Sequence, residues 1–229
     1  MTRRNHALIS AGTFAIAVAA IVWHVTAGAG PLPKTLAAAA PATPVRASQG
    51  AQQFVIDPQA SGASYRVGET FFRDNQFKVA VGVTHGIQGI VYVDSAHPDQ
   101  STIGPITINV NQLTSDSGHR DREIRSGWLE SDKYPTAVFT ATSIEGLPKA
   151  AAAGQTIHVR ITGNLTVHNV TKPAVFTGTL RYGGDTLTGN VESTVLMTDF
   201  GFDPPSIMML KTENKVTLDF QFTAHPSAG

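Results

Sequence analysis

The chain has 229 residues, no cysteine, and 17 basic against 17 acidic side chains, so its formal net charge is zero. The lack of cysteine excludes disulfides, thiolate metal centres and a cysteine nucleophile. Residues 1–53 hold four basic side chains and no acid, which leaves residues 54–229 with 13 basic and 17 acidic side chains. Because an acidic domain without a basic cluster lacks the charge pattern of a nucleic-acid binder, we expect no nucleic-acid partner.

The first residues combine a basic flank with a long apolar segment. Arg3 and Arg4 lie in the flank, residues 1–6, and the run ALISAGTFAIAVAAIVWHVTA follows over residues 7–27. As a helix this run would span roughly 31 Å, about the thickness of one bilayer core. It predicts a transmembrane anchor or a signal peptide. The sequence leaves open whether the segment is retained or is cleaved near residue 29.

The position of the basic flank predicts the orientation of the chain. Basic residues before an apolar segment favour a cytoplasmic N-terminus. We therefore expect contact with the membrane through residues 7–27 and a following domain outside the cytoplasm, periplasmic or extracellular. The domain would be secreted if residues 1–29 were cleaved. Residues 28–53 are rich in Ala and Pro, a composition typical of a disordered linker.

Residues 54–225 alternate apolar and polar side chains with the period of two that predicts β-strands. In the clearest run, 157–167, one parity is apolar and Gly163 marks a bulge or bend. Gly183-Gly184 predicts a tight hairpin, and prolines such as Pro173 predict strand ends. We expect about eight strands, the longest of them subdivided or bent, near residues 54–57, 63–72, 77–94, 103–111, 136–144, 155–168, 173–182, 185–198 and 214–224.

One segment of this domain has helical character. Residues 117–131 carry charges of alternating sign, and Ile124, Trp128 and Leu129 recur at helical spacing. This pattern predicts a short solvated helix with a narrow buried stripe, and Asp116 is a suitable N-cap.

Many long alternating strands and one short helix predict an all-β fold. We expect an antiparallel, lipocalin-like β-barrel, because closing the sheet removes its exposed edges. An eight-stranded barrel has an interior just wide enough to hold one small ligand. The expected organisation is thus a basic flank, a membrane segment, a linker and a barrel domain over residues 54–225.

The polar residues do not form a recognisable catalytic or metal-binding motif. His158 and His168 share one strand face but lie ten residues apart, which separates them by roughly 33 Å along an uninterrupted strand. Hydrolase, phosphate-loop and dinucleotide-binding motifs are missing. We expect no catalytic residue, no metal and no cofactor. An enzyme would be favoured only if at least two of four residues converged in one pocket, namely His85, Asp121, Glu123 and Asp199.

Several short motifs, taken in order, resemble the YceI-like, polyisoprenoid-binding family. The resemblance covers roughly residues 54–223, nearly all of the folded part. Each motif is weak alone, but six in the right order are a strong match. They are Phe54-Val55-Ile56-Asp57-Pro58, Gly86-Ile87-Gln88-Gly89-Ile90-Val91 with Asp94, Arg120-Asp121 with Arg125-Ser126, Lys133-Tyr134-Pro135-Thr136-Ala137-Val138-Phe139, Gly163-Asn164-Leu165-Thr166-Val167-His168 with Val170-Thr171-Lys172-Pro173, and Asp199-Phe200-Gly201.

This resemblance implies an exported barrel that holds a long isoprenoid-type lipid along its interior for carriage or storage. The apolar parity of the strands then supplies the candidate lining, and Trp128 would close one end. The candidate lipid-binding residues are Phe77, Val79, Val83, Val91, Ile108, Trp128, Phe139, Ile157, Val159, Ile161, Leu165, Leu180, Leu187, Val191, Leu218 and Phe220.

Two other functional classes stay open at this point. The same apolar parity would build a solid core, and the chain would then be a non-enzymatic structural or protein-interaction barrel. A hydrolase or a metal-dependent enzyme is the third class. An interior void below a few hundred Å³ would favour the solid barrel over a ligand carrier. The oligomeric state is open, a homodimer included.

Overall fold

The computed structural model describes residues 47–227. The basic flank 1–6, the membrane segment 7–27 and the linker up to residue 46 lie outside the described residues, so these expectations stay predictions. Among residues 47–227, none of the helices has the length and apolar character needed to cross a bilayer.

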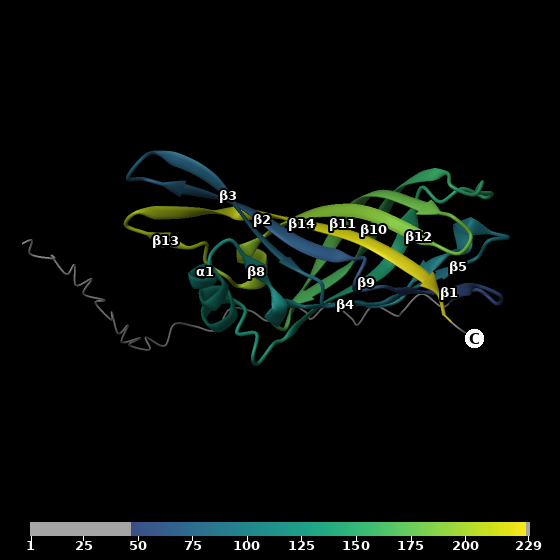
Figure 1. Cartoon of the computed structure of the whole chain (residues 1–229), viewed down its shortest axis with the longest axis horizontal. Coiled ribbons are helices and arrows are strands. Elements are labelled where there is room, and N and C mark those ends of the chain that lie inside the picture. The colour runs from purple at the N-terminus through teal and green to yellow at the C-terminus, as the bar shows by residue number, and fades with distance from the viewer. Residues whose placement is uncertain (1–46, 228–229) are drawn as a thin grey trace, which may run out of the picture. The chain divides into compact units, whose positions relative to one another are not determined.

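The described part is almost entirely antiparallel β-sheet, as expected (Figure 1). Its strands are β1 Gln52–Ile56, β2 Gly62–Phe71, β3 Gln76–Thr84, β4 Ile87–Gln88, β5 Ile90–Val93, β6 Thr102–Ile103, β7 Ile106–Asn109, β8 Thr114–Ser115, β9 Thr136–Glu145, β10 Thr156–Val167, β11 Val170–Tyr182, β12 Leu187–Leu196, β13 Ser206–Ile207 and β14 Leu210–Pro226. Short 3-10 turns cover Pro98–Gln100, Val110–Gln112 and Met197–Phe200.

The sheet is curled, because β4 at one end and β5, next to the other end, come from neighbouring residues. Its strand order is β4-β7-β9-β10-β11-β12-β14-β1-β5-β6, with β2, β3, β8 and β13 branching from β14. β4 pairs with β7, and β5, which follows two residues later, pairs with β1. The stretch 77–94, expected as one long or subdivided strand, is thus divided into β3, β4 and β5. The result is consistent with a lipocalin-like fold.

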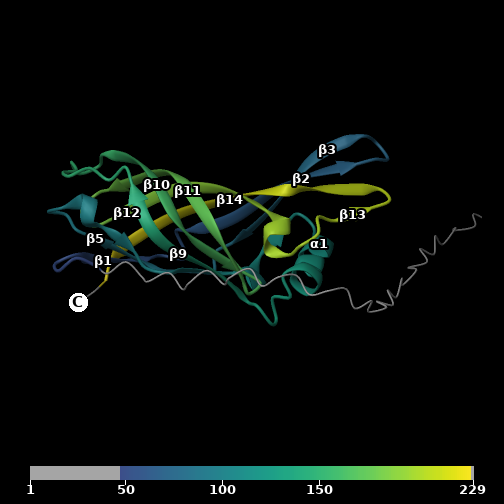
Figure 2. The same ribbon diagram turned by 180° about the vertical axis from the view of Figure 1, so that it is seen from behind.

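The longest strand, β14, connects two parts of the sheet. One edge of β14 pairs with β12, while the other pairs with β2 in its first part and with β1 near its end. A bulge between Thr212 and Val216 marks the point where the pairing with β2 shifts. The first part of β14 and the β2–β3 hairpin extend beyond the rest of the sheet in the views of Figures 1 and 2.

The strand β10 follows the sequence-based expectation closely. Ile157, Val159 and Ile161 are buried, and the register against β9 shifts between Thr162 and Gly163. A Cβ atom at Gly163 would overlap the carbonyl oxygen of Thr140 and the ring of Phe139 on β9. The predicted bulge at Gly163 is therefore confirmed, and close packing against β9 is the reason for glycine there.

The two hairpins flanking β11 differ in how well the sequence predicted them. The Gly183-Gly184 turn joins β11 to β12 as expected. Pro173, by contrast, lies inside β11, opposite Asn164. Proline is tolerated because the β12 pairing begins only at Thr177, so at this point β11 has a neighbour on one side alone. The chain reverses earlier, at His168-Asn169, where both residues have positive φ, as a two-residue primed turn requires.

The predicted helix is present but shorter than expected. α1 covers Gly118–Glu123 and continues as one wide π turn over Ile124–Trp128. Ser117, not Asp116, is the N-cap, and its hydroxyl accepts a hydrogen bond from the backbone amide of Arg120. The prediction of Asp116 as the N-cap is wrong, because its carboxylate accepts a hydrogen bond from the Arg120 guanidinium instead.

The strand β3 reverses the expected orientation. Phe77 and Val79 are 59% and 53% exposed, whereas Ala80 and Gly82 are buried. The inner face has no room for large side chains, because a Cβ atom at Gly82 would overlap the ring of Tyr65 on β2. The apolar parity of β3 therefore faces outward, and the prediction that Phe77, Val79 and Val83 line the interior is wrong.

Candidate functional site

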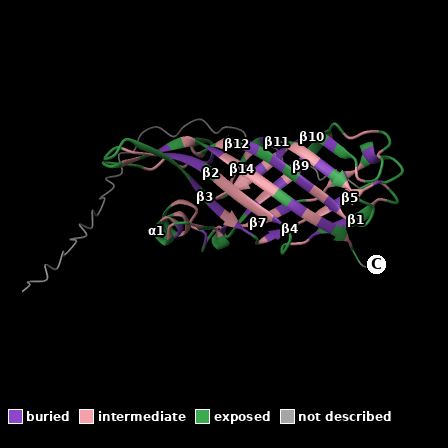
Figure 3. Ribbon diagram, turned by 45° about the horizontal axis from the view of Figure 1, so that its top comes forward, coloured by how far each residue is buried: buried purple, intermediate pink, exposed green. Residues whose placement is uncertain are grey.

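A cavity of about 720 Å³ lies inside the curled sheet. The inner faces of β2, β5, β7, β9, β10, β11, β12 and β14 line it, together with α1 and the π turn that follows. Figure 3 shows buried and partly buried residues along the crossing strands of this part of the sheet. The volume falls within the range of roughly 300–1,000 Å³ that is typical of small-molecule sites.

Most of the sixteen predicted lining residues reach this cavity. Ten of them line it, namely Val91, Ile108, Trp128, Phe139, Ile161, Leu165, Leu180, Val191, Leu218 and Phe220. Their place in the cavity is a structural fact, and their contact with a lipid stays a prediction.

The other six divide into two groups. Phe77, Val79 and Val83 belong to the outward face of β3. Ile157, Val159 and Leu187 are buried in the main core cluster but do not line the cavity. These three residues thus lie in the interior of the sheet, as predicted, but not beside the cavity, because the interior has two parts. One part is filled by side chains, and the other is hollow.

Several residues that line the cavity from the segment following β12 were not predicted from the sequence. Met197, Phe200, Phe202, Ile207 and Leu210 surround the cavity between β12 and the start of β14. The segment has no strand alternation that could separate inward from outward positions. The signal that it does carry is a high density of large apolar residues after β12.

Polar side chains gather where the helix meets the sheet. Tyr65 and Glu69 on β2 and His119, Arg120 and Glu123 on α1 all line the cavity. The remaining lining is largely apolar, so these groups give the cavity one polar region. A small number of polar groups in an apolar pocket can orient a ligand.

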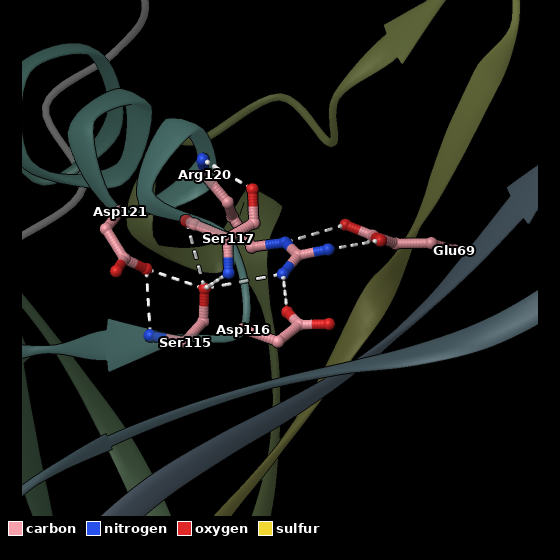
Figure 4. Close-up of polar contacts among 6 residues, drawn as sticks. All are labelled: Glu69, Ser115, Asp116, Ser117, Arg120 and Asp121. Carbon is pink, nitrogen blue, oxygen red and sulfur yellow. Dashed lines mark hydrogen bonds and ion pairs between the residues drawn. The ribbon is translucent and has the colours of Figure 1, made fainter.

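Arg120 is the centre of a hydrogen-bond network in this region (Figure 4). Its Nη2 donates to Glu69 Oε2 at 3.0 Å and its Nε donates to Oε1 at 3.4 Å. The same guanidinium donates to Asp116 and to the Ser115 hydroxyl. Burial disfavours the charged guanidinium, but the hydrogen bonds and charges of Glu69 and Asp116 outweigh it and raise the pKa of Arg120.

Asp121, beside Arg120, holds the start of the helix against β8. One of its carboxylate oxygens accepts from the Ser115 backbone amide at 2.9 Å and from the Ser115 hydroxyl at 2.6 Å. Asp121 is buried and does not line the cavity. Its observed contacts therefore position α1.

Tyr65 is the buried aromatic group of the polar region. Burial raises its pKa from 10.0 to about 12, and the charges of Asp121 and Glu69 act in the same direction against the opposing charge of Arg120. Its buried hydroxyl has no hydrogen-bond partner among the described residues. The ring covers Gly82, its partner residue on the neighbouring strand β3.

The residues that would have favoured an enzyme do not converge. Of His85, Asp121, Glu123 and Asp199, Glu123 alone lines the cavity. The Nδ1 of His85 donates to the backbone carbonyl oxygen of Ser61 at 2.6 Å. Within residues 47–227, no three His, Asp or Glu side chains are grouped closely enough to hold a metal ion.

An antiparallel sheet curled around an apolar cavity, with a short helix beside it, is the architecture of lipocalin-like binding folds. The chain belongs to the YceI-like domain family, whose model matches residues 54–224. The resemblance drawn from the sequence motifs is thereby confirmed.

Relatives at moderate identity support this assignment. A UPF0312 protein of Pseudomonas putida is 31% identical over 162 residues, which cover 64% of this chain and 80% of the relative. A UPF0312 protein of Pseudomonas savastanoi pv. phaseolicola is 30% identical over 181 residues, or 72% of this chain and 87% of the relative.

Solved structures share the fold at lower identity. BcnA of Burkholderia cenocepacia matches with a TM-score of 0.57 and 19% identity over 73% of this chain and 98% of its own. A polyisoprenoid binding domain from Saccharophagus degradans matches with a TM-score of 0.56 and 12% identity over 77% of this chain and 99% of its own. At these identities the likeness concerns the fold.

Proposed function

We propose that the chain is an exported, membrane-tethered carrier that binds a long apolar lipid of the isoprenoid type inside its sheet. The observation that carries the proposal is the cavity of about 720 Å³ with its mostly apolar lining. The similarity in fold to a polyisoprenoid binding domain supports the choice of ligand class.

The cavity can supply the binding free energy from its apolar lining alone. Each buried methylene group contributes about 0.8 kcal/mol. Ten such groups would contribute roughly 8 kcal/mol, before the cost of association is subtracted. No hydrogen bond to the lipid chain is needed, and selectivity would come from the width and length of the cavity.

The polar region gives the bound lipid an orientation in this proposal. The apolar chain would lie against β9, β10 and β14, and the polar end of the lipid would lie near α1. Arg120 is already paired with Glu69 and Asp116. A lipid head group would therefore meet a neutralised network, with no isolated positive charge to bind it.

The tether is inferred from the sequence. Residues 7–27 are long and apolar enough to span a bilayer, and basic residues precede them. A retained segment would hold the carrier near membranes that contain its ligand. Mass spectrometry of the chain in intact membrane fractions, compared with the secreted fraction, would show whether residues 1–29 remain attached.

Native mass spectrometry of the purified full chain, followed by lipid extraction, tests the binding function. We expect a mass increment that is removed by organic extraction and identified as a long-chain lipid. A chain that carries no extractable lipid, and that takes up none from vesicles containing polyprenols, would refute the proposal. A structural or protein-interaction domain whose cavity holds no lipid would then be the better description.

A further inference from the structure

Two neighbouring hairpins carry exposed apolar side chains at one end of the sheet. The turn between β2 and β3 exposes Phe72, and Phe77 follows on β3. The turn between β13 and β14 exposes Ile207, Met208 and Met209. Their exposed fractions are between 50% and 95%. We call these five residues the apolar tip.

The two hairpins form one surface. The backbone amide of Phe72 donates to the carbonyl oxygen of Met209 at 3.0 Å, and Phe71 pairs with Leu210 in the adjoining strands. Figures 1 and 2 show both turns at the same end of the sheet, beyond α1. Large apolar groups that gather on an exposed surface usually mark an interaction site.

The apolar tip is continuous with the cavity. Phe71, Ile207 and Leu210 line the cavity, and each is next to an exposed residue of the tip in the chain. Ile207 both lines the cavity and is 65% exposed, so the cavity reaches the surface at this residue. Met208 and Met209 follow Ile207 directly in the chain, so exposed residues of the tip adjoin this opening.

The charge around the apolar tip differs from that of the domain. Residues 71–78 and 206–211 contain three basic side chains, Arg73, Lys78 and Lys211, and one acid, Asp74. Residues 54–229 as a whole carry four more acids than bases. Among the described residues, none of these three basic side chains forms an ion pair. Within these two windows basic side chains therefore outnumber acidic ones by two, whereas acids are in excess over the domain.

We propose that the apolar tip docks into the surface of a bilayer that contains anionic lipids, with the cavity mouth at Ile207 facing the lipid. Phe and Met side chains would enter the boundary between head groups and acyl chains, and the basic side chains would contact anionic head groups. The proposal rests on the proposed function, because a lipid carrier needs a route between its cavity and a membrane.

The lack of cysteine in the chain permits a site-specific test. Met208→Cys in the full chain is labelled with an environment-sensitive fluorophore and mixed with vesicles of phosphatidylcholine and phosphatidylglycerol. The matched control is Val55→Cys, since Val55 is an exposed apolar residue on β1, outside the tip. Both chains keep residues 1–46, so any contribution of that segment to vesicle binding is common to them.

We expect the label at residue 208 to shift to shorter wavelength and to be quenched by lipids brominated in their acyl chains. The label at residue 55 should show neither change. Adding Lys78→Gln and Lys211→Gln should reduce the shift at residue 208, and vesicles of phosphatidylcholine alone should give a smaller shift than anionic ones. Circular dichroism of each variant establishes that it is folded.

Three results would overturn the docking proposal. The label at residue 208 could keep its aqueous emission with vesicles, both labels could respond equally, or the shift at residue 208 could grow with protein concentration in the absence of vesicles. The last result would assign the tip to contact with a second copy of the chain. Lipid extraction of the same samples separates the two proposals, because a chain that carries lipid but does not insert its tip refutes only the docking.

Discussion

Arg120 on α1 and Glu69 on β2 form an ion pair that joins the helix to the sheet beside the cavity, with Nη2 and Oε2 3.0 Å apart. The Glu69 side chain is 8% exposed and that of Arg120 is 22% exposed. Removing the guanidinium would therefore leave a nearly buried carboxylate without its cation. Such a loss is costly, because the desolvation of the remaining charge is no longer compensated.

We predict that Arg120→Ala lowers the free energy of unfolding by about 1.5–3 kcal/mol, the range for hydrogen bonds to charged groups. Urea denaturation at neutral pH measures the change. Arg122→Ala is the matched control, because Arg122 is exposed on the same helix and forms no ion pair among the described residues. Equal effects of the two substitutions would show that the pair with Glu69 does not hold the helix.

The raised pKa of Tyr65 predicts how the free energy of unfolding changes at alkaline pH. Burial raises its pKa from 10.0 to about 12, so between these values the unfolded chain has lost a proton that the folded chain still holds. The stabilising contribution of the neutral phenol is therefore complete below pH 10.0 and is lost as the pH rises toward about 12. Tyr65→Phe should reduce the fall in stability over this window, measured by urea denaturation at several pH values.

The same substitution has an expected effect at neutral pH. The Tyr65 hydroxyl is buried without a hydrogen-bond partner in the described part of the chain, and such a group costs about 1–3 kcal/mol. Tyr65→Phe should thus leave the free energy of unfolding unchanged or raise it by about 1 kcal/mol. Tyr134→Phe is the control, because it removes a tyrosine hydroxyl elsewhere in the fold. A clear loss of stability in Tyr65→Phe would indicate that the hydroxyl has a partner in solution.

A substitution that fills the cavity should weaken lipid binding and leave the fold intact. Ala137 on β9 lines the cavity, and its neighbour Val138 has the opposite parity and does not line it. Ala137→Phe would displace part of the lipid, and the loss of two methylene contacts alone amounts to about 1.6 kcal/mol, or roughly tenfold in affinity. Native mass spectrometry with added polyprenol should show this loss, and Val138→Phe should bind normally.

At the Gly163 bulge we expect an added methyl group to destabilise the fold by overpacking, although no existing contact is removed. Gly163→Ala would place a methyl group against the Thr140 carbonyl oxygen and the Phe139 ring. We expect a loss of about 1–3 kcal/mol from this overpacking, measured by thermal and urea unfolding. Gly118→Ala is the control, since nothing lies within 4 Å of a Cβ atom at that position, and it should keep or slightly raise stability.

The outward orientation of β3 can be tested directly. Val79→Ser should change the free energy of unfolding by no more than about 0.5 kcal/mol, because Val79 is 53% exposed. Val159→Ser should cost at least about 2 kcal/mol, because Val159 is 5% exposed and the hydroxyl of the introduced serine would be buried. If Val79→Ser were as destabilising as Val159→Ser, β3 would face inward as the sequence pattern suggested.

Alternation predicted strands wherever the two faces of a strand meet different surroundings. In β10 it predicted both the buried residues and the bulge at Gly163, because polar side chains there face solvent and apolar ones face the core. In β3 the same pattern misled. Its apolar side chains cover the outside of a hairpin, and its inner face is occupied by the ring of Tyr65. Periodicity separates two faces but does not say which of them is inside.

The sequence by itself determined the antiparallel β class, the turn at Gly183-Gly184, the bulge at Gly163, the short helix and membership of the YceI-like family. These features depend on local alternation, turn residues and short motifs. Only the tertiary structure decided that the interior is partly hollow, that Ile157, Val159 and Leu187 fill its solid part, and that residues following β12, such as Phe202 and Leu210, line the cavity. A packed core and an empty cavity use the same apolar side chains, and only the distance between facing strands distinguishes them.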